Sequence, residues 1–275
     1  MADQPNTLEI TVRSLDGLRL AGTAVVPTGR PVGAAVLVHG GGVTREEGGF
    51  YTRLAAGLAA AGIASLRFDF RAHGDSEGRP EDVTIAGIVN DIRAVMDQLQ
   101  FLLGDEAPIN LIGASFGGGI TAYAAARYPK RVRRLVLINP LLNYKKRFID
   151  DKPYWHDDRI DEYAGAELTA DGFLSHSPTF KLGRTLLNEV FHLQPHAALG
   201  AIEAPTLFIH GTRDTFIPVE SSRWAVNQIE PEAKLIEIDG AQHGIAVPDD
   251  PHYRNPQTRA WQASVIETIT TWLTN

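Results

Sequence analysis

Two serines of this chain stand in the pattern Gly-x-Ser-x-Gly. Ser76 lies in GDSEG at 74–78, and Ser115 lies in GASFG at 113–117. In a nucleophile elbow with this pattern, the glycines leave room for a sharp turn from a strand into a helix, and the serine hydroxyl is exposed at its tip. The pattern alone is weak evidence in a chain with 26 glycines, so the flanking sequence must decide between the two.

The flanking sequence predicts an elbow at Ser115 and a loop at Ser76. The apolar segment 109–112 enters Ser115 as a strand, and 116–128 leaves it as a helix. The free N–H groups at the start of that helix favour developing negative charge. Ser76 is separated from the strand before it by polar residues, and the Glu-Gly-Arg-Pro that follows cannot begin a helix at once.

A serine hydroxyl is a weak nucleophile unless a base removes its proton and an acid orients that base. Asp214 follows a predicted strand at 206–210, and His243 follows another at 234–238. Both therefore lie at the carboxyl ends of strands, where the sites of open α/β sheets are found. We expect His243 to take the proton of Ser115 and return it to the leaving group, with Asp214 fixing the imidazole tautomer.

Other residues are weaker candidates for the acid and the base. Asp69 precedes the nucleophile in the chain, against the order Ser, Asp, His. Asp239 is only four residues from His243, so Asp214 is the favoured acid. His252 lies in a loop rich in proline and aspartate and has little strand context, so His243 is the favoured base.

An acyl-transfer site also needs two backbone N–H donors for the developing oxyanion. One is expected from Phe116, directly after the nucleophile, and the other from the HGGG loop at 39–42. Gly41 is the favoured second donor because glycine lets the peptide face the substrate without steric cost. Gly42 is expected to lie against the substrate. Loss of one donor of this kind costs about 3 kcal/mol of transition-state stabilisation.

The elements that would position these residues follow an α/β pattern. Alternating segments at 8–14 and 19–26 flank Asp16-Gly17 and predict an antiparallel hairpin. Continuous apolar segments then predict buried parallel strands at 34–39, 63–68, 109–113, 134–139, 206–210 and 234–238. Amphipathic segments predict helices at 50–61, 84–103, 116–128, 219–229 and 257–273. The alternation predicts a doubly wound, mostly parallel α/β sheet.

The alternation stops between residues 141 and 200. This segment is acidic and aromatic and has a helical pattern around 179–192. A structureless loop of that length is unusual in a compact domain. We therefore expect 141–200 to be a cap inserted over the carboxyl ends of the strands, with 1–140 and 201–275 forming the core. Its aromatic residues either line the substrate pocket or form a small core of the cap; they include Tyr144, Tyr154 and Trp155.

Several segments together resemble a known family: VLVHGGG, GIASLRFDFRAHGDSEG, NLIGASFGGG, LFIHGTRDTFIP and DGAQHG. They are similar to the α/β-hydrolase serine esterases, a group that includes bacterial cinnamoyl and feruloyl esterases. The resemblance covers nearly all of the chain outside 141–200. It implies the α/β-hydrolase fold, the triad Ser115, Asp214 and His243, and a structural role for the loop that contains Ser76.

The expected function is a cofactor-free serine hydrolase that cleaves a carboxylic ester of a small or medium-sized molecule through an acyl-enzyme. The same triad could hydrolyse a thioester or a carbon–carbon bond, transfer the acyl group to an alcohol, or eliminate a carboxylate, because fold and triad are shared across these reactions. A non-catalytic binding protein is a third hypothesis. Its usual mark is a damaged triad, and all three members are present here.

Composition argues against several other classes. The net charge of −7 and the short basic runs argue against a nucleic-acid binder. The absence of cysteine excludes disulfides, thiolate metal sites and a cysteine nucleophile. His192 and His196 have the spacing of a helical metal pair, but Pro195 interrupts the helix and no glutamate adjoins them, so no metal is expected.

The sequence also bears on location. The N-terminus lacks the basic start and apolar stretch of a signal peptide. The longest uncharged apolar stretch, 54–66, is shorter than the about 20 residues that a membrane span needs. A cytoplasmic protein with no membrane insertion is expected.

Overall fold

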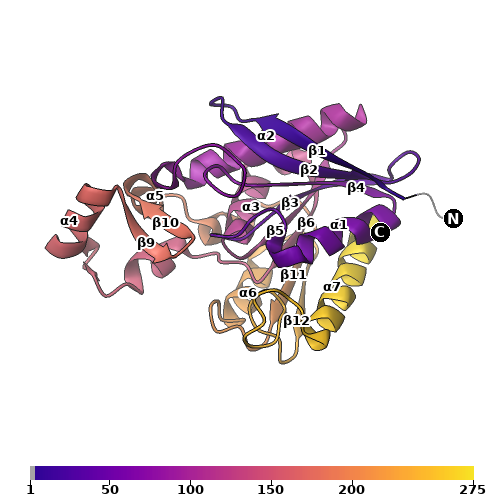
Figure 1. Ribbon diagram of the computed structural model, residues 1–275. Helices are drawn as coiled ribbons and strands as arrows, with labels where there is room; N and C mark the ends of the chain where they lie inside the picture. The colour runs from indigo at the N-terminus through magenta and orange to yellow at the C-terminus, as the bar shows by residue number, and fades with distance from the viewer. Residues whose placement is uncertain (1–3) are drawn as a thin grey trace.

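The predicted apolar strands form the centre of an eight-stranded sheet (Figure 1). This computed structural model describes residues 4–275. The strands are β1 (Asn6–Arg13), β2 (Arg19–Val26), β3 (Gly33–Val38), β4 (Ile63–Phe68), β5 (Ile109–Ala114), β6 (Val132–Ile138), β11 (Thr206–Gly211) and β12 (Ala233–Ile238). Their order is β1-β2-β4-β3-β5-β6-β11-β12, and all pairs from β4 to β12 are parallel. The expected mostly parallel sheet is therefore confirmed.

The N-terminal hairpin is the antiparallel part of the sheet. β1 pairs antiparallel with β2, which pairs antiparallel with β4. Five residues join β1 to β2, and of the Asp16-Gly17 pair only Gly17 adopts a positive φ, of 95°. The Ser14 hydroxyl closes the loop, since it accepts a hydrogen bond from the Leu18 N–H at 2.8 Å and donates to Asp16 at 2.6 Å.

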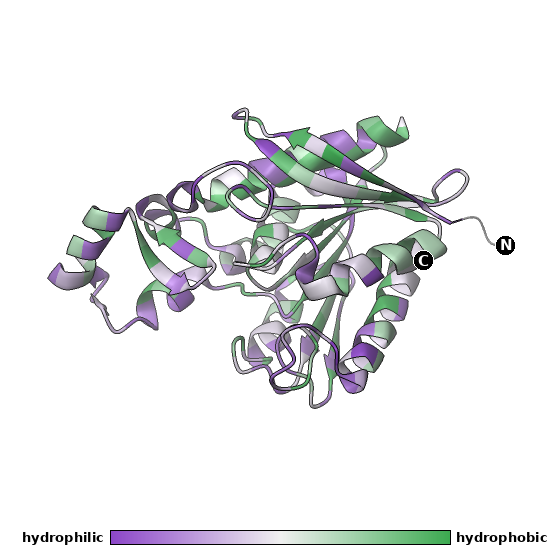
Figure 2. Cartoon of the chain, in the orientation of Figure 1, coloured by the Kyte–Doolittle hydropathy of each residue, from purple (hydrophilic) through white to green (hydrophobic). Residues whose placement is uncertain are grey.

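Helices cover both faces of the sheet, which explains why β4, β5 and β11 are buried at every position. The helices are α1 (Phe50–Ala60), α2 (Ile85–Leu103), α3 (Ser115–Arg127), α6 (Glu220–Ala225) and α7 (Pro256–Thr274). Helices α1 and α7 pack on one face, and α2 and α3 pack on the other. Figure 2 shows apolar strands at the centre and hydrophilic residues on α2 and α7.

The chain folds outward from the middle of the sheet. From β3 it proceeds to β4 on one side, and from β5 it proceeds through β6 and β11 to β12 on the other. β3 and β5 are neighbours, so the loops that follow them leave the same edge of the sheet side by side. At such a switch point the loops separate and leave room for a site.

Residues 141–200 form a series of short elements, part of which projects from the sheet on the left of Figure 1. They are η4 (Lys146–Asp150), β7 (Trp155–His156), β8 (Arg159–Ile160), α4 (Glu162–Asp171), β9 (Phe173–Ser177), β10 (Phe180–Gly183), α5 (Arg184–Glu189) and η5 (Pro195–Ala201). The helix expected around 179–192 is limited to α5. The residues before it form β10, because Phe180 and Leu182 alternate as buried positions in a hairpin with β9.

None of the helices within residues 4–275 combines the length and the apolar character that crossing a membrane requires.

Candidate active site

Ser115 lies at the sharp turn from β5 into α3. Its φ is 53°, in the left-handed region, which costs a non-glycine residue on the order of 1–3 kcal/mol. The flanking glycines are required by close packing. A Cβ at Gly117 would lie 1.9 Å from the carbonyl oxygen of His39, and one at Gly113 would lie 2.3 Å from the Thr121 hydroxyl. Gly117 therefore lets α3 approach the loop after β3, and Gly113 lets β5 pack closely against α3.

The Gly117→Ala variant is expected to be less stable than the wild type by roughly 1–3 kcal/mol or more, because the new methyl group overlaps backbone that cannot move freely. Urea denaturation measures this loss. The control is Gly165→Ala in α4, where a Cβ would lie 3.7 Å from Ile160 and alanine favours the helix by about 1 kcal/mol. Equal stability of the two variants would contradict the steric role of Gly117.

The structure brings the three expected triad residues together. The Nε2 atom of His243 lies 2.9 Å from the Oγ atom of Ser115, and its Nδ1 atom lies 2.7 Å from Oδ2 of Asp214. The Asp214 side chain is fully buried, whereas that of His243 is 26% exposed. The imidazole therefore bridges a buried carboxylate and a hydroxyl at the edge of a cavity.

Asp214 accepts four hydrogen bonds. Its Oδ1 atom accepts from the backbone N–H groups of Phe216 at 2.8 Å and Ile217 at 2.9 Å. Its Oδ2 atom accepts from the side-chain amide of Asn139 at 2.7 Å and from His243. Asn139 follows β6 at the same edge of the sheet, and its φ is 43°. Sequence reasoning missed it, although a polar residue directly after a buried strand was the available signal.

These hydrogen bonds keep the Asp214 carboxylate ionised. Burial alone would raise its pKa. The imidazole of His210, whose Nε2 atom lies 3.5 Å from Oδ2, acts together with His243 and the Ile217 N–H; they outweigh burial and hold the pKa well below its usual range. An ionised Asp214 accepts a hydrogen bond from the Nδ1–H group of His243, so the lone pair of Nε2 faces Ser115. This is the tautomer that a general base requires.

The N–H groups of the HGGG loop have different partners. The N–H of Gly40 donates to the buried carboxylate of Glu47 at 2.7 Å, and that of Gly42 donates to Nε2 of His73 at 3.1 Å. The N–H of Gly41 donates no hydrogen bond within residues 4–275. Glu47, in a left-handed conformation with φ of 46°, is a second residue that sequence reasoning missed.

His39 orients the peptide between Gly40 and Gly41. Its Nε2 atom accepts from the Phe70 N–H at 3.0 Å, so its Nδ1–H donates to the carbonyl oxygen of Gly40 at 2.7 Å. Burial lowers the pKa of His39 to about 3, which keeps the ring neutral. In a trans peptide the N–H points away from the preceding carbonyl oxygen, so this bond turns the Gly41 N–H away from His39.

Gly41 and Phe116 line the same cavity as Ser115. The N–H of Phe116, at the start of α3, likewise donates no hydrogen bond within the described chain. Two N–H groups that have no partner among residues 4–275 and line one cavity with a serine hydroxyl are suited to bind an oxyanion.

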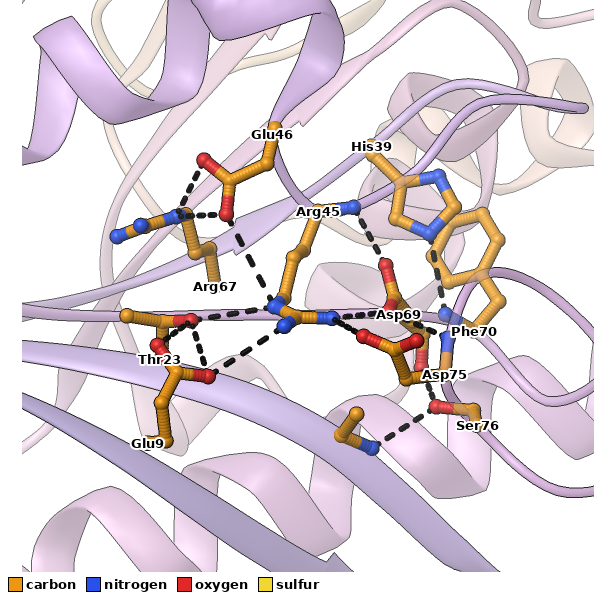
Figure 3. Close-up of polar contacts among 11 residues, drawn as sticks. Glu9, Thr23, His39, Arg45, Glu46, Arg67, Asp69, Phe70, Asp75 and Ser76 are labelled. Carbon is orange, nitrogen blue, oxygen red and sulfur yellow. Dashed lines mark hydrogen bonds and ion pairs between the residues drawn. The ribbon is translucent and has the colours of Figure 1, made fainter.

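Ser76 belongs to a polar network with Asp69 and Arg45, which is drawn in Figure 3. Its hydroxyl donates to the carbonyl oxygen of Asp69 at 2.7 Å and accepts from the Ala21 N–H at 2.9 Å. The Asp69 carboxylate accepts from the backbone N–H of Arg45 at 2.6 Å and pairs with the Arg45 guanidinium. Ser76 and Asp69 thus tie a loop to β2, and neither contacts Ser115 or His243.

The cavity at Ser115 has a volume of about 320 Å³, within the range of small-molecule sites. It is lined by core residues such as Phe216 and by residues of 141–200 such as Phe148 and Phe180. The Phe180 ring of β10 lies 4.9 Å from that of Phe116. A cavity of about 610 Å³ lies elsewhere, between Arg30 and Arg133, and contains none of these groups.

Four residues expected against the substrate do not line this cavity. Gly42 is turned toward His73, and Tyr144 is fully buried, with its hydroxyl donating to the carbonyl oxygen of Phe116. Tyr154 and Trp155 are partly buried against the main core, and the Trp155 ring lies 6.0 Å from that of Phe191. The cavity instead takes its aromatic wall from Phe148, Phe180 and Phe216.

Within residues 4–275 no group of three or more His, Asp or Glu side chains is arranged to hold a metal ion.

Comparison with known proteins gives a matching family and several relatives. The profile of the family described as serine aminopeptidase, S33, matches residues 29–157, which include Ser115 but not Asp214 or His243. The monoacylglycerol lipase of Mycolicibacterium smegmatis is 25% identical, over 96% of each chain. The pimeloyl-[acyl-carrier protein] methyl ester esterase of Chromobacterium violaceum is 27% identical, over 76% of this chain and 86% of its own.

Among solved structures, Est1E from Butyrivibrio proteoclasticus with ferulic acid bound superposes with a TM-score of 0.79. The match covers 97% of this chain and all of Est1E, at 21% identity. At that identity the likeness shows a shared fold.

Proposed function

The chain is an enzyme of the α/β-hydrolase fold, as the resemblance implied, and we propose that it hydrolyses carboxylic esters of small molecules. The observation that carries this proposal is the chain of contacts from Asp214 through His243 to Ser115, at 2.7 and 2.9 Å. The lipase and esterase relatives support the ester as the bond that is cleaved.

The proposed reaction begins when the Oγ atom of Ser115 attacks the ester carbonyl carbon while Nε2 of His243 takes its proton. The N–H groups of Gly41 and Phe116 bind the oxyanion of the tetrahedral intermediate. His243 then protonates the leaving alcohol, and an acyl-enzyme remains on Ser115. Water, deprotonated by His243, attacks the acyl-enzyme, so the overall reaction converts ester and water into acid and alcohol.

Segment 141–200 is proposed to act as the cap of this site. Its residues Phe148 and Phe180 line the cavity, and Phe180 packs on the oxyanion loop, where a Cβ at Gly41 would lie 3.2 Å from its ring. The fit of the acyl and alcohol groups would therefore depend on this segment, while the core supplies the chemistry.

A fluorophosphonate probe and labelled water test the proposal. The probe should attach to Ser115, as mapped by mass spectrometry of the digested protein. Hydrolysis of an ethyl ester in oxygen-18 water should place the label in the acid, whereas elimination would give ethene and an unlabelled acid. Lack of probe labelling, under conditions that label a control serine hydrolase, would refute the nucleophile and favour a binding protein.

A further inference from the structure

One end of the active-site cavity is basic. Arg147 and Lys152 line it together with Ser115, and the lining residues include no aspartate or glutamate. Arg147 is half-buried, and within residues 4–275 its guanidinium has no hydrogen bond and no ion pair. The Nζ atom of Lys152 has one polar side-chain contact in the same part of the chain, to Nδ1 of His176 at 3.3 Å.

The neighbouring lysines, unlike Arg147 and Lys152, form ion pairs with carboxylates. Lys145 pairs with Asp150 and Asp158, both at 2.7 Å, and Lys146 pairs with Asp151 at 2.6 Å. Three carboxylates of segment 141–200 thus pair with lysines outside the cavity, and none pairs with Arg147 or Lys152 within residues 4–275. A charge withdrawn from water without a partner is unfavourable. The two cations that face the cavity are therefore the ones left for a ligand.

His176 adds a donor without adding charge. Burial and the adjacent Lys152 and Arg147 lower its pKa to about 4, so the imidazole is neutral at pH 7. Its Nδ1 accepts from the Lys152 ammonium, which leaves its Nε2–H as a donor. Burial and Arg147 also lower the pKa of Lys152. An anion placed between the two cations would stabilise the charged form of each.

We propose that this cavity takes an ester that carries a carboxylate, with Arg147 and Lys152 binding the carboxylate while the ester carbonyl lies at Ser115. The inference rests on the proposed ester hydrolysis at the same site. The guanidinium fork matches a carboxylate in a bidentate geometry. The apolar spacer between the two groups of the substrate would lie against Phe148 and Phe180. A half-ester of a short dicarboxylic acid has this shape and fits about 320 Å³.

Matched substrates test the inference in the wild-type protein, at pH 7.5 and low ionic strength. Monomethyl adipate is compared with the methyl ester of adipic monoamide, which has the same shape and no charge. We expect kcat/KM, measured by methanol release, to be at least tenfold higher for the carboxylate. The net charge of −7 would by itself disfavour an anion, so such a preference has to come from local groups.

A second pair of esters locates the anion, and a phosphate analogue tests its chemistry. Para-acetoxybenzoate and para-acetoxybenzamide place the charge on the alcohol side, and para-acetoxyphenyl phosphate replaces the carboxylate with a phosphate. A preference for either carboxylate supports the inference and shows which side of the ester the cations bind. A preference confined to the phosphate would overturn the carboxylate assignment, and the absence of any anionic preference would overturn the basic subsite.

Variants connect the preference to the two cations. Arg147→Met and Lys152→Met should each lower the ratio of kcat/KM for carboxylate over amide by at least tenfold. Lys146→Met removes a charge from the adjacent, exposed, ion-paired lysine and should leave the ratio unchanged. A ratio that neither cavity variant changes would refute the assignment. If the amide ester is hydrolysed without anionic preference, only this inference fails; if Ser115 is not labelled and no ester is hydrolysed, the proposed function fails.

Discussion

Replacing Ser115 with alanine is expected to lower kcat/KM for an activated ester by on the order of 10⁴–10⁶-fold. Alanine has no oxygen to attack the carbonyl carbon, so the acyl-enzyme cannot form. The residual rate would come from the oxyanion donors and from binding, which remain in place. Release of para-nitrophenol from an acetate or butyrate ester, with active-site titration by a fluorophosphonate, measures the loss.

Ser76→Ala is the matched control, because Ser76 stands in the same sequence pattern. Its hydroxyl bridges the carbonyl oxygen of Asp69 and the N–H of Ala21. Losing two half-buried hydrogen bonds should lower stability by about 1–2 kcal/mol, while kcat/KM stays within a few-fold of the wild type. If Ser76→Ala abolished turnover and Ser115→Ala did not, the nucleophile would be misassigned.

The sheet could be predicted from the sequence because its strands are buried on both faces. Continuous apolar segments then stand out, and the predicted strand at 63–68 has the same bounds as β4. Helix α2 was predicted within one residue because Thr84 caps its start and Gly104, with φ of 62°, ends it. The candidate triad was predictable for a related reason: each residue follows a strand or a strand-helix turn at one edge of the sheet.

Segment 141–200 was not predictable in the same way. Its strands are only two to five residues long, so no periodicity persists over enough residues to identify them. The roles of its side chains also depend on contacts between distant parts of the chain. Phe180 reaches Gly41, and Arg147 reaches the cavity at Ser115, across separations that no local pattern encodes. Asn139 had a local signal, as a polar residue directly after a buried strand, but its partner Asp214 is 75 residues away in the sequence.

Asp214→Asn is expected to lower kcat by on the order of 10⁴-fold while the fold is retained. The amide oxygen can still accept from the N–H groups of Phe216 and Ile217. The amide nitrogen then takes the position of Oδ2, where it faces the side-chain amide of Asn139 and Nδ1 of His243. Since Nδ1 must now accept, the proton moves to Nε2, and the imidazole can no longer take the proton of the serine hydroxyl.

Asp239→Asn is the control for the acid, because Asp239 is the other aspartate near His243 in the sequence. It is exposed, and its carboxylate contacts only the hydroxyl of Thr212, at 3.2 Å, within the described residues. Its replacement should leave kcat and the rate of fluorophosphonate labelling within a few-fold of the wild type. Asp214→Asn should instead slow labelling about as much as it slows turnover, because both reactions need the base to activate the same hydroxyl. A loss of less than tenfold in Asp214→Asn would mean that the tautomer of His243 is set by another group.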